Sequence, residues 1–198
     1  MTLFHYDLPE AIAKEGGWEN RAIVDAFAEY ARACFTAFGD RVKLWVTINE
    51  PKYYAYCSHM VGNYPPNHRH DFNRYFTMVY HEAVASAKAV AIYHSLKLNG
   101  SIGIVHDSSN VEVAPDTKEK ERVHMIADLF YNRIILDTAC KGEFPGALIP
   151  LLRKYGIDTS YIKFEDMLVF LQGKVDFLGL NVYNRFYITD YSCLLYTS

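Results

Sequence analysis

Apolar residues occur in this chain in two alternating patterns, short continuous runs and repeats at helical spacing. Short runs bounded by polar turns predict β-strands, and apolar residues that recur every three or four positions predict α-helices. The predicted strands are residues 2–6, 44–48, 101–106 and 175–181. The predicted helices are residues 23–38, 73–98, 118–139 and 166–171, and the predicted loops include residues 52–70 and 111–117. Strands that alternate with helices predict an α/β fold, a parallel sheet with helices packed outside it.

The helix predicted at residues 23–38 shows the helical pattern most clearly. Its apolar positions share one face, and they are Ile23, Phe27, Tyr30, Ala31, Cys34 and Phe38. Gly39 follows as a helix stop. We therefore interpret Cys34 as a small core residue.

The composition indicates one domain with a single apolar core. The chain has 198 residues, of which 51% are hydrophobic and 15% aromatic, and no low-complexity linker interrupts the strand–helix series. We therefore predict one domain over residues 1–190. Residues 191–198 fit neither pattern, and we interpret them as a non-native tail.

Charge and hydropathy narrow the choice of partners. The formal net charge is -3, which gives no reason to expect a nucleic acid or an anionic membrane as a partner. No apolar run approaches the roughly 20 residues that a membrane helix needs. Strand-like residues follow Met1 at once, so we expect no signal peptide. The many aromatic residues suit a cleft for a small polar molecule with apolar ring faces, such as a sugar.

The candidate catalytic group is Glu50, which follows the strand predicted at residues 44–48. Asn49 stands beside it, and Pro51 ends the strand because it has no N–H group. The carboxyl ends of strands carry the catalytic groups of α/β barrels. A carboxylate held next to an amide suits general acid/base chemistry on a polar substrate. Asn-Glu-Pro is also an ordinary turn signal, so these residues alone leave both interpretations open.

Two further predicted strands end in polar side chains. His5 lies at the end of the first strand, and Asn181 and Tyr183 lie at the end of the last. Parallel strands end on the same side of a sheet, so we expect these groups to converge on the cleft that holds Glu50. The alternatives are a core histidine at His5 and a packed core tyrosine at Tyr183.

The sequence predicts neither a metal site nor a cofactor. The four cysteines are widely spaced and form no CxxC pair. His68 and His70 lie in a polar loop, and we interpret them as solvated because no third ligand is apparent beside them.

Several segments in the expected order resemble glycoside hydrolase family 1, and the resemblance extends over nearly all of residues 1–190. The matching segments are TLFHYDLP (residues 2–9), GGW (16–18), FGDRVKLWVTINEP (38–51), GEFP (142–145) and DFLGLNVY (176–183).

This resemblance implies a (β/α)₈ TIM barrel, of which the chain supplies about strands 3 to 6 as an internal fragment. It implies a retaining, β-glucosidase-like enzyme that hydrolyses β-D-glucosides by double displacement. Glu50 is then the general acid/base, and His5, Asn49, Asn181 and Tyr183 are sugar-binding residues. The implied partner is a small-molecule β-glycoside, whereas the oligomeric state stays open.

The chain departs from the family pattern in two ways. The nucleophile of the family is a glutamate in a Thr-Glu-Asn-Gly type motif at the seventh strand, and the chain contains no such motif. Retaining hydrolysis needs two carboxylates about 5–5.5 Å apart, so we expect the chain alone to be inactive. Lys52 stands where many members place an aromatic residue on the aglycone side, so the resemblance implies no aglycone preference.

Three alternatives within this resemblance stay open. In a myrosinase-like thioglucosidase of plants the acid/base glutamate is missing, so Glu50 argues against that activity. A phospho-β-glucosidase needs a basic phosphate site from barrel strands that this chain does not contain. A Klotho-like binding module keeps the fold but loses a catalytic carboxylate. The compartment is undetermined, and a secreted or lysosomal-type location is compatible with the resemblance.

Overall fold

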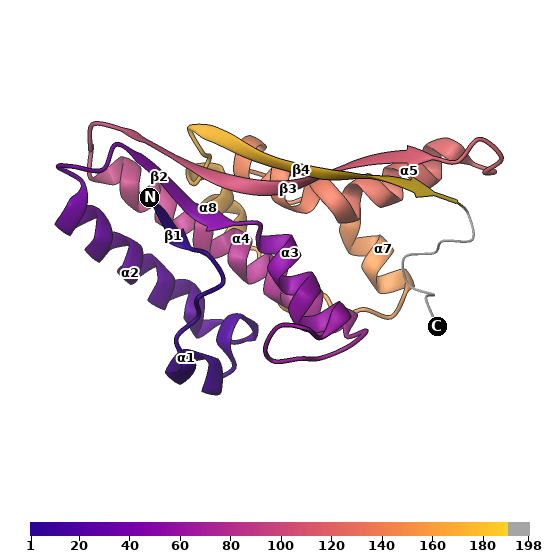
Figure 1. The fold of residues 1–198 in the computed structure, drawn as a ribbon, viewed down its shortest axis with the longest axis horizontal. Helices are drawn as coiled ribbons and strands as arrows, with labels where there is room; N and C mark the ends of the chain where they lie inside the picture. The colour runs from indigo at the N-terminus through magenta and orange to yellow at the C-terminus, as the bar shows by residue number, and fades with distance from the viewer. Residues whose placement is uncertain (190–198) are drawn as a thin grey trace.

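A computed structural model describes residues 1–189, and Figure 1 shows its strands side by side with the helices below them. The strands are β1 (Thr2–Phe4), β2 (Leu44–Asn49), β3 (Ser101–Val113) and β4 (Phe177–Ile188). The helices are α1 (Glu10–Lys14), α2 (Ala22–Phe38), α3 (Pro51–Tyr56), α4 (Phe72–Ser95), α5 (Lys120–Asp128), α6 (Ile134–Leu136), α7 (Leu148–Lys154) and α8 (Asp166–Gln172). A 3₁₀ turn lies at Gly17–Glu19, and π-helical turns lie at Cys57–Val61, Leu129–Arg133 and Asp137–Lys141. The proposed non-native tail, residues 191–198, lies outside the described residues.

The four strands form one parallel sheet in the order β1-β2-β3-β4. Thr2 lies opposite Val46, Val46 opposite Gly103, and Gly103 opposite Phe177. The predicted parallel α/β arrangement is therefore confirmed. Because the strands run in the same direction, the residues at their carboxyl ends gather at one edge of the sheet.

The sheet packs against a helix layer through alternate residues of its strands. The ring of Trp45 in β2 meets the ring of Phe35 in α2 edge-on, with centroids 4.9 Å apart. The hydroxyl of Thr47 shares a hydrogen bond of 2.7 Å with the hydroxyl of Ser86 in α4. Leu44, on the opposite face of the same strand, is 63% exposed. At the start of β2 the two-residue period thus separates a helix-covered face from a more open one, whereas Ile48, further along the face of Leu44, is buried.

Small residues let neighbouring elements approach α4 closely. Ala85, Ala87 and Ala89 of this central helix are buried. A Cβ atom at Gly173, just after α8, would lie 2.3 Å from the carbonyl oxygen of Ala87. Only glycine fits at this crossing of α8 over α4.

A buried carboxylate joins three helical segments of the layer. Asp166, at the start of α8, accepts two hydrogen bonds from the guanidinium of Arg21, at 2.8 and 2.5 Å. The hydroxyl of Tyr80 in α4 donates to the same carboxylate at 2.8 Å. These bonds compensate the desolvation of Asp166, which is 1% exposed.

Three predicted boundaries around the sheet are wrong. Residues 52–70, predicted as a loop, begin with α3 and the π-helical turn at Cys57–Val61, because Pro51 is a favourable first residue of a helix as well as a strand stop. Residues 111–113, also predicted as loop, belong to β3, and β4 extends beyond Asn181 to Ile188. The extension follows from pairing, since Val111 to Val113 lie opposite Phe186 to Ile188.

Other helical predictions are confirmed in part. Cys34 is buried as expected, whereas Tyr30 and Phe38 of the same predicted stripe are 47% and 39% exposed. The helix predicted at residues 118–139 begins at Lys120 and contains two π-helical turns, and the short helices α1 and α7 were not predicted. None of the helices in residues 1–189 is both long enough and apolar enough to cross a membrane.

Candidate active site

Glu50 forms the junction between β2 and α3 in a left-handed backbone conformation, with φ 49° and ψ 57°. For a residue other than glycine, this conformation is less stable than the right-handed one by about 1–2 kcal/mol. Two backbone hydrogen bonds hold it. The N–H group of Glu50 donates to the carbonyl of Val105 in β3 at 2.8 Å, and its carbonyl accepts from the N–H group of Tyr54 at 3.1 Å. A strained, well-held junction at the carboxyl edge of the sheet is typical of a functional position.

The carboxylate of Glu50 accepts three side-chain hydrogen bonds. Its Oε2 atom accepts from the hydroxyl of Tyr6 at 2.6 Å. Its Oε1 atom accepts from the amide of Asn181 at 2.6 Å and from the hydroxyl of Tyr183 at 3.1 Å. Glu50 is only 5% exposed. Hydrogen bonds to a charged acceptor are short and strong, so these donors fix the carboxylate in one orientation.

The structure brings the sequence-predicted residues to this edge of the sheet. Asn49 donates from its amide to the hydroxyl of Tyr6 at 3.3 Å, next to Glu50. His5 is exposed, and its ring meets that of Tyr6 with centroids 5.3 Å apart. Tyr183 is 72% exposed. The alternatives of a core histidine and a packed core tyrosine are therefore wrong.

Tyr6 is a site residue that the sequence pattern did not indicate. Its φ angle is 74°, and its ring stacks on that of Tyr54 with centroids 5.2 Å apart. Burial, together with the hydrogen bond to Glu50, raises the pKa of Tyr6 well above its ordinary value. The hydroxyl therefore stays protonated and donates to the carboxylate. Its position directly after His5, at the end of a predicted strand, is the sequence feature that could have identified it.

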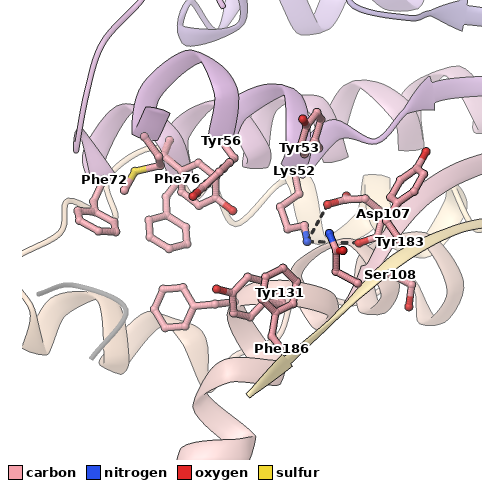
Figure 2. Close-up of a pocket in the computed structure, with 14 residues that line it drawn as sticks. Lys52, Tyr53, Tyr56, Phe72, Phe76, Asp107, Ser108, Tyr131, Tyr183 and Phe186 are labelled. Carbon is pink, nitrogen blue, oxygen red and sulfur yellow. Dashed lines mark hydrogen bonds and ion pairs between the residues drawn. The ribbon is translucent and has the colours of Figure 1, made fainter. Parts of the chain in front are cut away.

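A cavity of about 350 Å³, shown in Figure 2, adjoins the Glu50 site. Tyr183 connects the two, because it lines the cavity and donates to Glu50. The lining is mostly aromatic, and it includes Tyr53, Tyr56, Tyr75, Phe76, Phe130, Tyr131 and Phe186. Such a wall favours flat or apolar groups.

One ion pair interrupts this aromatic wall. The ammonium of Lys52 reaches from α3 toward β3, where it lies 2.8 Å from the carboxylate of Asp107 (Figure 2). It also lies 5.2 Å from the ring centroid of Tyr131, a cation–π contact. Burial raises the pKa of Asp107, and Lys52 opposes that effect. Burial, with Lys52 as the second cause, lowers the pKa of the adjacent His106 to about 4.

A second polar cluster lies outside the Glu50 site. Possible ligand atoms of Glu19, His59 and His68 all lie within 4.8 Å of one another. The expectation that no third ligand accompanies His68 is therefore wrong, while His70 is not a member of this cluster.

Comparison with known proteins assigns the chain to a family. The sequence profile of Glycosyl hydrolase family 1 matches residues 1–194. The chain belongs to this family. Its sheet is part of a (β/α)₈ barrel, about strands 3 to 6, as predicted.

Individual relatives in the family give the extent of the match. The chain is 38% identical over 183 residues to the 6-phospho-β-glucosidase GmuD of Bacillus subtilis, covering 92% of this chain and 39% of that protein. It is 37% identical over 185 residues to β-glucosidase A of Thermotoga maritima, covering 93% and 40%. The crystal structure of a β-glucosidase from Exiguobacterium marinum superposes with a TM-score of 0.85 at 34% identity, covering 97% of this chain and 46% of that one. The chain thus spans about two fifths of the length of these two curated relatives.

Replacing Tyr6 with Phe in the complete family 1 barrel removes the hydroxyl that donates to Glu50 and keeps the ring on Tyr54. A hydrogen bond to a charged group contributes about 1.5–3 kcal/mol. Under the β-glycosidase function proposed below, we therefore expect kcat/KM for an aryl β-glucoside to fall about 10- to 100-fold. Tyr30→Phe is the matched control, because the Tyr30 hydroxyl donates to the backbone of Leu3 and not to Glu50. Equal effects of the two variants would contradict the role of Tyr6.

Proposed function

We propose that this chain supplies the general acid/base and part of the sugar site of a retaining β-glycosidase that hydrolyses β-D-glucosides by double displacement. The observation that carries the proposal is the Glu50 carboxylate, held by three donors at the carboxyl edge of a parallel sheet and beside a cavity. Membership in Glycosyl hydrolase family 1 and the names of the relatives support it.

The position of Glu50 suits both halves of a double displacement. A glycosidic oxygen is a poor leaving group until it is protonated, so the acid form of Glu50 gives its proton to that oxygen. The resulting carboxylate then takes a proton from the water that hydrolyses the glycosyl-enzyme. Tyr6, Asn181 and Tyr183 hold the carboxylate in place between these steps, because each donates to one of its oxygens.

The neighbouring polar groups suit a sugar ring. We assign the amide of Asn49 to the sugar 2-hydroxyl, a contact that strengthens in the oxocarbenium-like transition state. His5, exposed at the same edge, is assigned to another ring hydroxyl. Asn181 and Tyr183 carry donors that a sugar hydroxyl can share with Glu50.

The aromatic cavity suits the aglycone. The proton of Glu50 goes to the oxygen that joins sugar and aglycone, so the aglycone lies near Glu50. Tyr183 lines the cavity and donates to Glu50, which supports an aglycone site against this wall. A flat apolar aglycone fits the rings, and the Lys52–Asp107 pair offers it a polar contact.

A phosphorylated sugar is the second candidate substrate, because relatives of the chain are named 6-phospho-β-glucosidase and 6-phospho-β-galactosidase. A 6-phosphate needs a cationic site, and the barrel strands expected to supply it are not part of this chain. The unphosphorylated glucoside is our first candidate because other relatives are named β-glucosidase. The two candidates are distinguished by comparing kcat/KM for 4-nitrophenyl β-glucoside and for its 6-phosphate. A higher kcat/KM for the 6-phosphate would replace the proposed substrate. It would leave the proposed role of Glu50 unchanged. Glu50 itself argues against a thioglucosidase and against a Klotho-like binding module.

Replacing Glu50 with Gln in the complete barrel tests its role as the proton donor. We expect kcat/KM for cellobiose, whose leaving group needs a proton, to fall about 10²–10⁴-fold. For 2,4-dinitrophenyl β-glucoside, whose leaving group needs none, we expect less than about a tenfold fall in the same parameter. Glu112→Gln is the control, since this half-exposed glutamate of β3 pairs with Arg185. An equal loss for both substrates would contradict the assignment.

The second carboxylate of a retaining glycosidase is assigned to a barrel strand that this chain does not contain. We therefore propose that residues 1–198 alone are inactive, because one carboxylate cannot form and hydrolyse the glycosyl-enzyme. The expected result is no hydrolysis of 4-nitrophenyl β-glucoside above the buffer rate by a soluble preparation of the chain. Turnover that Glu50→Gln abolishes would overturn this proposal.

A further inference from the structure

Three potential metal ligands meet between segments that are distant in the sequence. Glu19 ends the 3₁₀ turn before α2, His59 lies in the π-helical turn after α3, and His68 lies in the loop before α4. The Oε1 atom of Glu19 is 3.7 Å from Nε2 of His59 and 3.9 Å from Nδ1 of His68. Ligand atoms around a tetrahedral zinc ion are about 3.4 Å apart, given Zn–N and Zn–O lengths near 2.0–2.1 Å. The two contacts of Glu19 are thus within about half an ångström of zinc geometry, and the two histidine nitrogens lie within 4.8 Å of each other.

His59 is the independent observation that points to a ligand. The residue is 0% exposed, and within the described part of the chain neither of its ring nitrogens has a hydrogen-bond partner. A buried polar group without a partner is destabilising by about 1–3 kcal/mol.

The cluster is accessible from outside. Glu19 and His59 both line a surface hollow of about 710 Å³, which also borders Tyr6, Tyr54 and Tyr64. An ion can approach from this side at Glu19, which is partly exposed, and the side chains that cover the nitrogens of His59 must move for it to bind there.

Arg74 is the cation already near the cluster. Its Nε atom lies 3.3 Å from Oε2 of Glu19, and its Nη1 atom lies 2.7 Å from Nδ1 and 2.8 Å from Nε2 of His68. None of these contacts involves Oε1 of Glu19, which is the oxygen near both histidines. None of them gives a ring nitrogen of His59 a hydrogen-bond partner. Arg74 is partly exposed and also lies 3.4 Å from the carboxylate of Asp71. It can turn toward Asp71 when an ion takes its place beside His68.

We propose that Glu19, His59 and His68 form a zinc site, with water as the fourth ligand. Two imidazoles and one carboxylate are a ligand set that Zn²⁺ prefers. The ion would tie the start of α2 to the segment between α3 and α4. Tyr64 of that segment packs against Tyr6, with ring centroids 5.8 Å apart, so zinc would steady the wall next to the Glu50 site. This inference does not rest on the proposed glycosidase activity.

The test is a titration of the complete, EDTA-treated protein with Co²⁺, whose visible absorption reports tetrahedral coordination, followed by displacement with Zn²⁺. We expect one Co²⁺ per chain in the wild type. Glu19→Gln and His68→Asn should weaken binding by at least about tenfold, as the loss of a ligand does. Arg74→Gln should tighten it, because a competing positive charge is removed. His70→Asn is the matched control, two residues from His68 and outside the cluster, and should bind as the wild type does.

These variants keep the proposal falsifiable even if a change at buried His59 prevents folding. Zn²⁺ should also raise the melting temperature of the wild type and of His70→Asn, and leave that of Glu19→Gln unchanged. Absence of stoichiometric binding by the wild type would overturn the proposal. Equal affinity of the wild type, Glu19→Gln and His68→Asn would also overturn it, because the ion would then sit on unrelated surface groups.

Discussion

The hydrogen bonds that converge on Glu50 require the ends of β1 and β2 to lie level with the middle of β4. Tyr6 lies 44 residues from Glu50 in the sequence and Asn181 lies 131 residues from it, yet each donates to a carboxylate oxygen at 2.6 Å. Parallel pairing provides this alignment. A one-residue slip of any of these strands would turn its side chains to the opposite face and break the cluster.

Buried ionic contacts hold the frame around this cluster. The Asp166 carboxylate, bonded to Arg21 and Tyr80, fixes α8 against the start of α2 and against α4. The Lys52–Asp107 pair joins α3, which begins directly after Glu50, to the middle of β3. Breaking a buried pair leaves an uncompensated charge and is strongly destabilising, so these pairs restrict how far α3 and its neighbours can move relative to the sheet.

The sequence predicted the structure correctly where the local pattern of apolar and polar residues determines it. Apolar periodicity predicted the strands and α4, and the strand-end rule predicted that Asn49, Glu50, Asn181 and Tyr183 would meet. It failed where the deciding contact is distant in the sequence. The length of β4 depends on its pairing with β3, the Tyr6–Glu50 bond depends on a turn with positive φ, and the Glu19–His59–His68 cluster joins three separate segments, none of which a local pattern reveals.

The central claim is that Glu50 moves the proton in both steps of a retaining reaction. Its most direct test is the Glu50→Ala variant of the complete barrel, assayed with 2,4-dinitrophenyl β-glucoside in the presence of sodium azide. This substrate can form the glycosyl-enzyme without a proton donor, and azide can attack the intermediate without a general base. The account predicts that azide accelerates turnover and that NMR identifies the product as β-glucosyl azide. Turnover that azide does not accelerate, or an α-azide product, would contradict it.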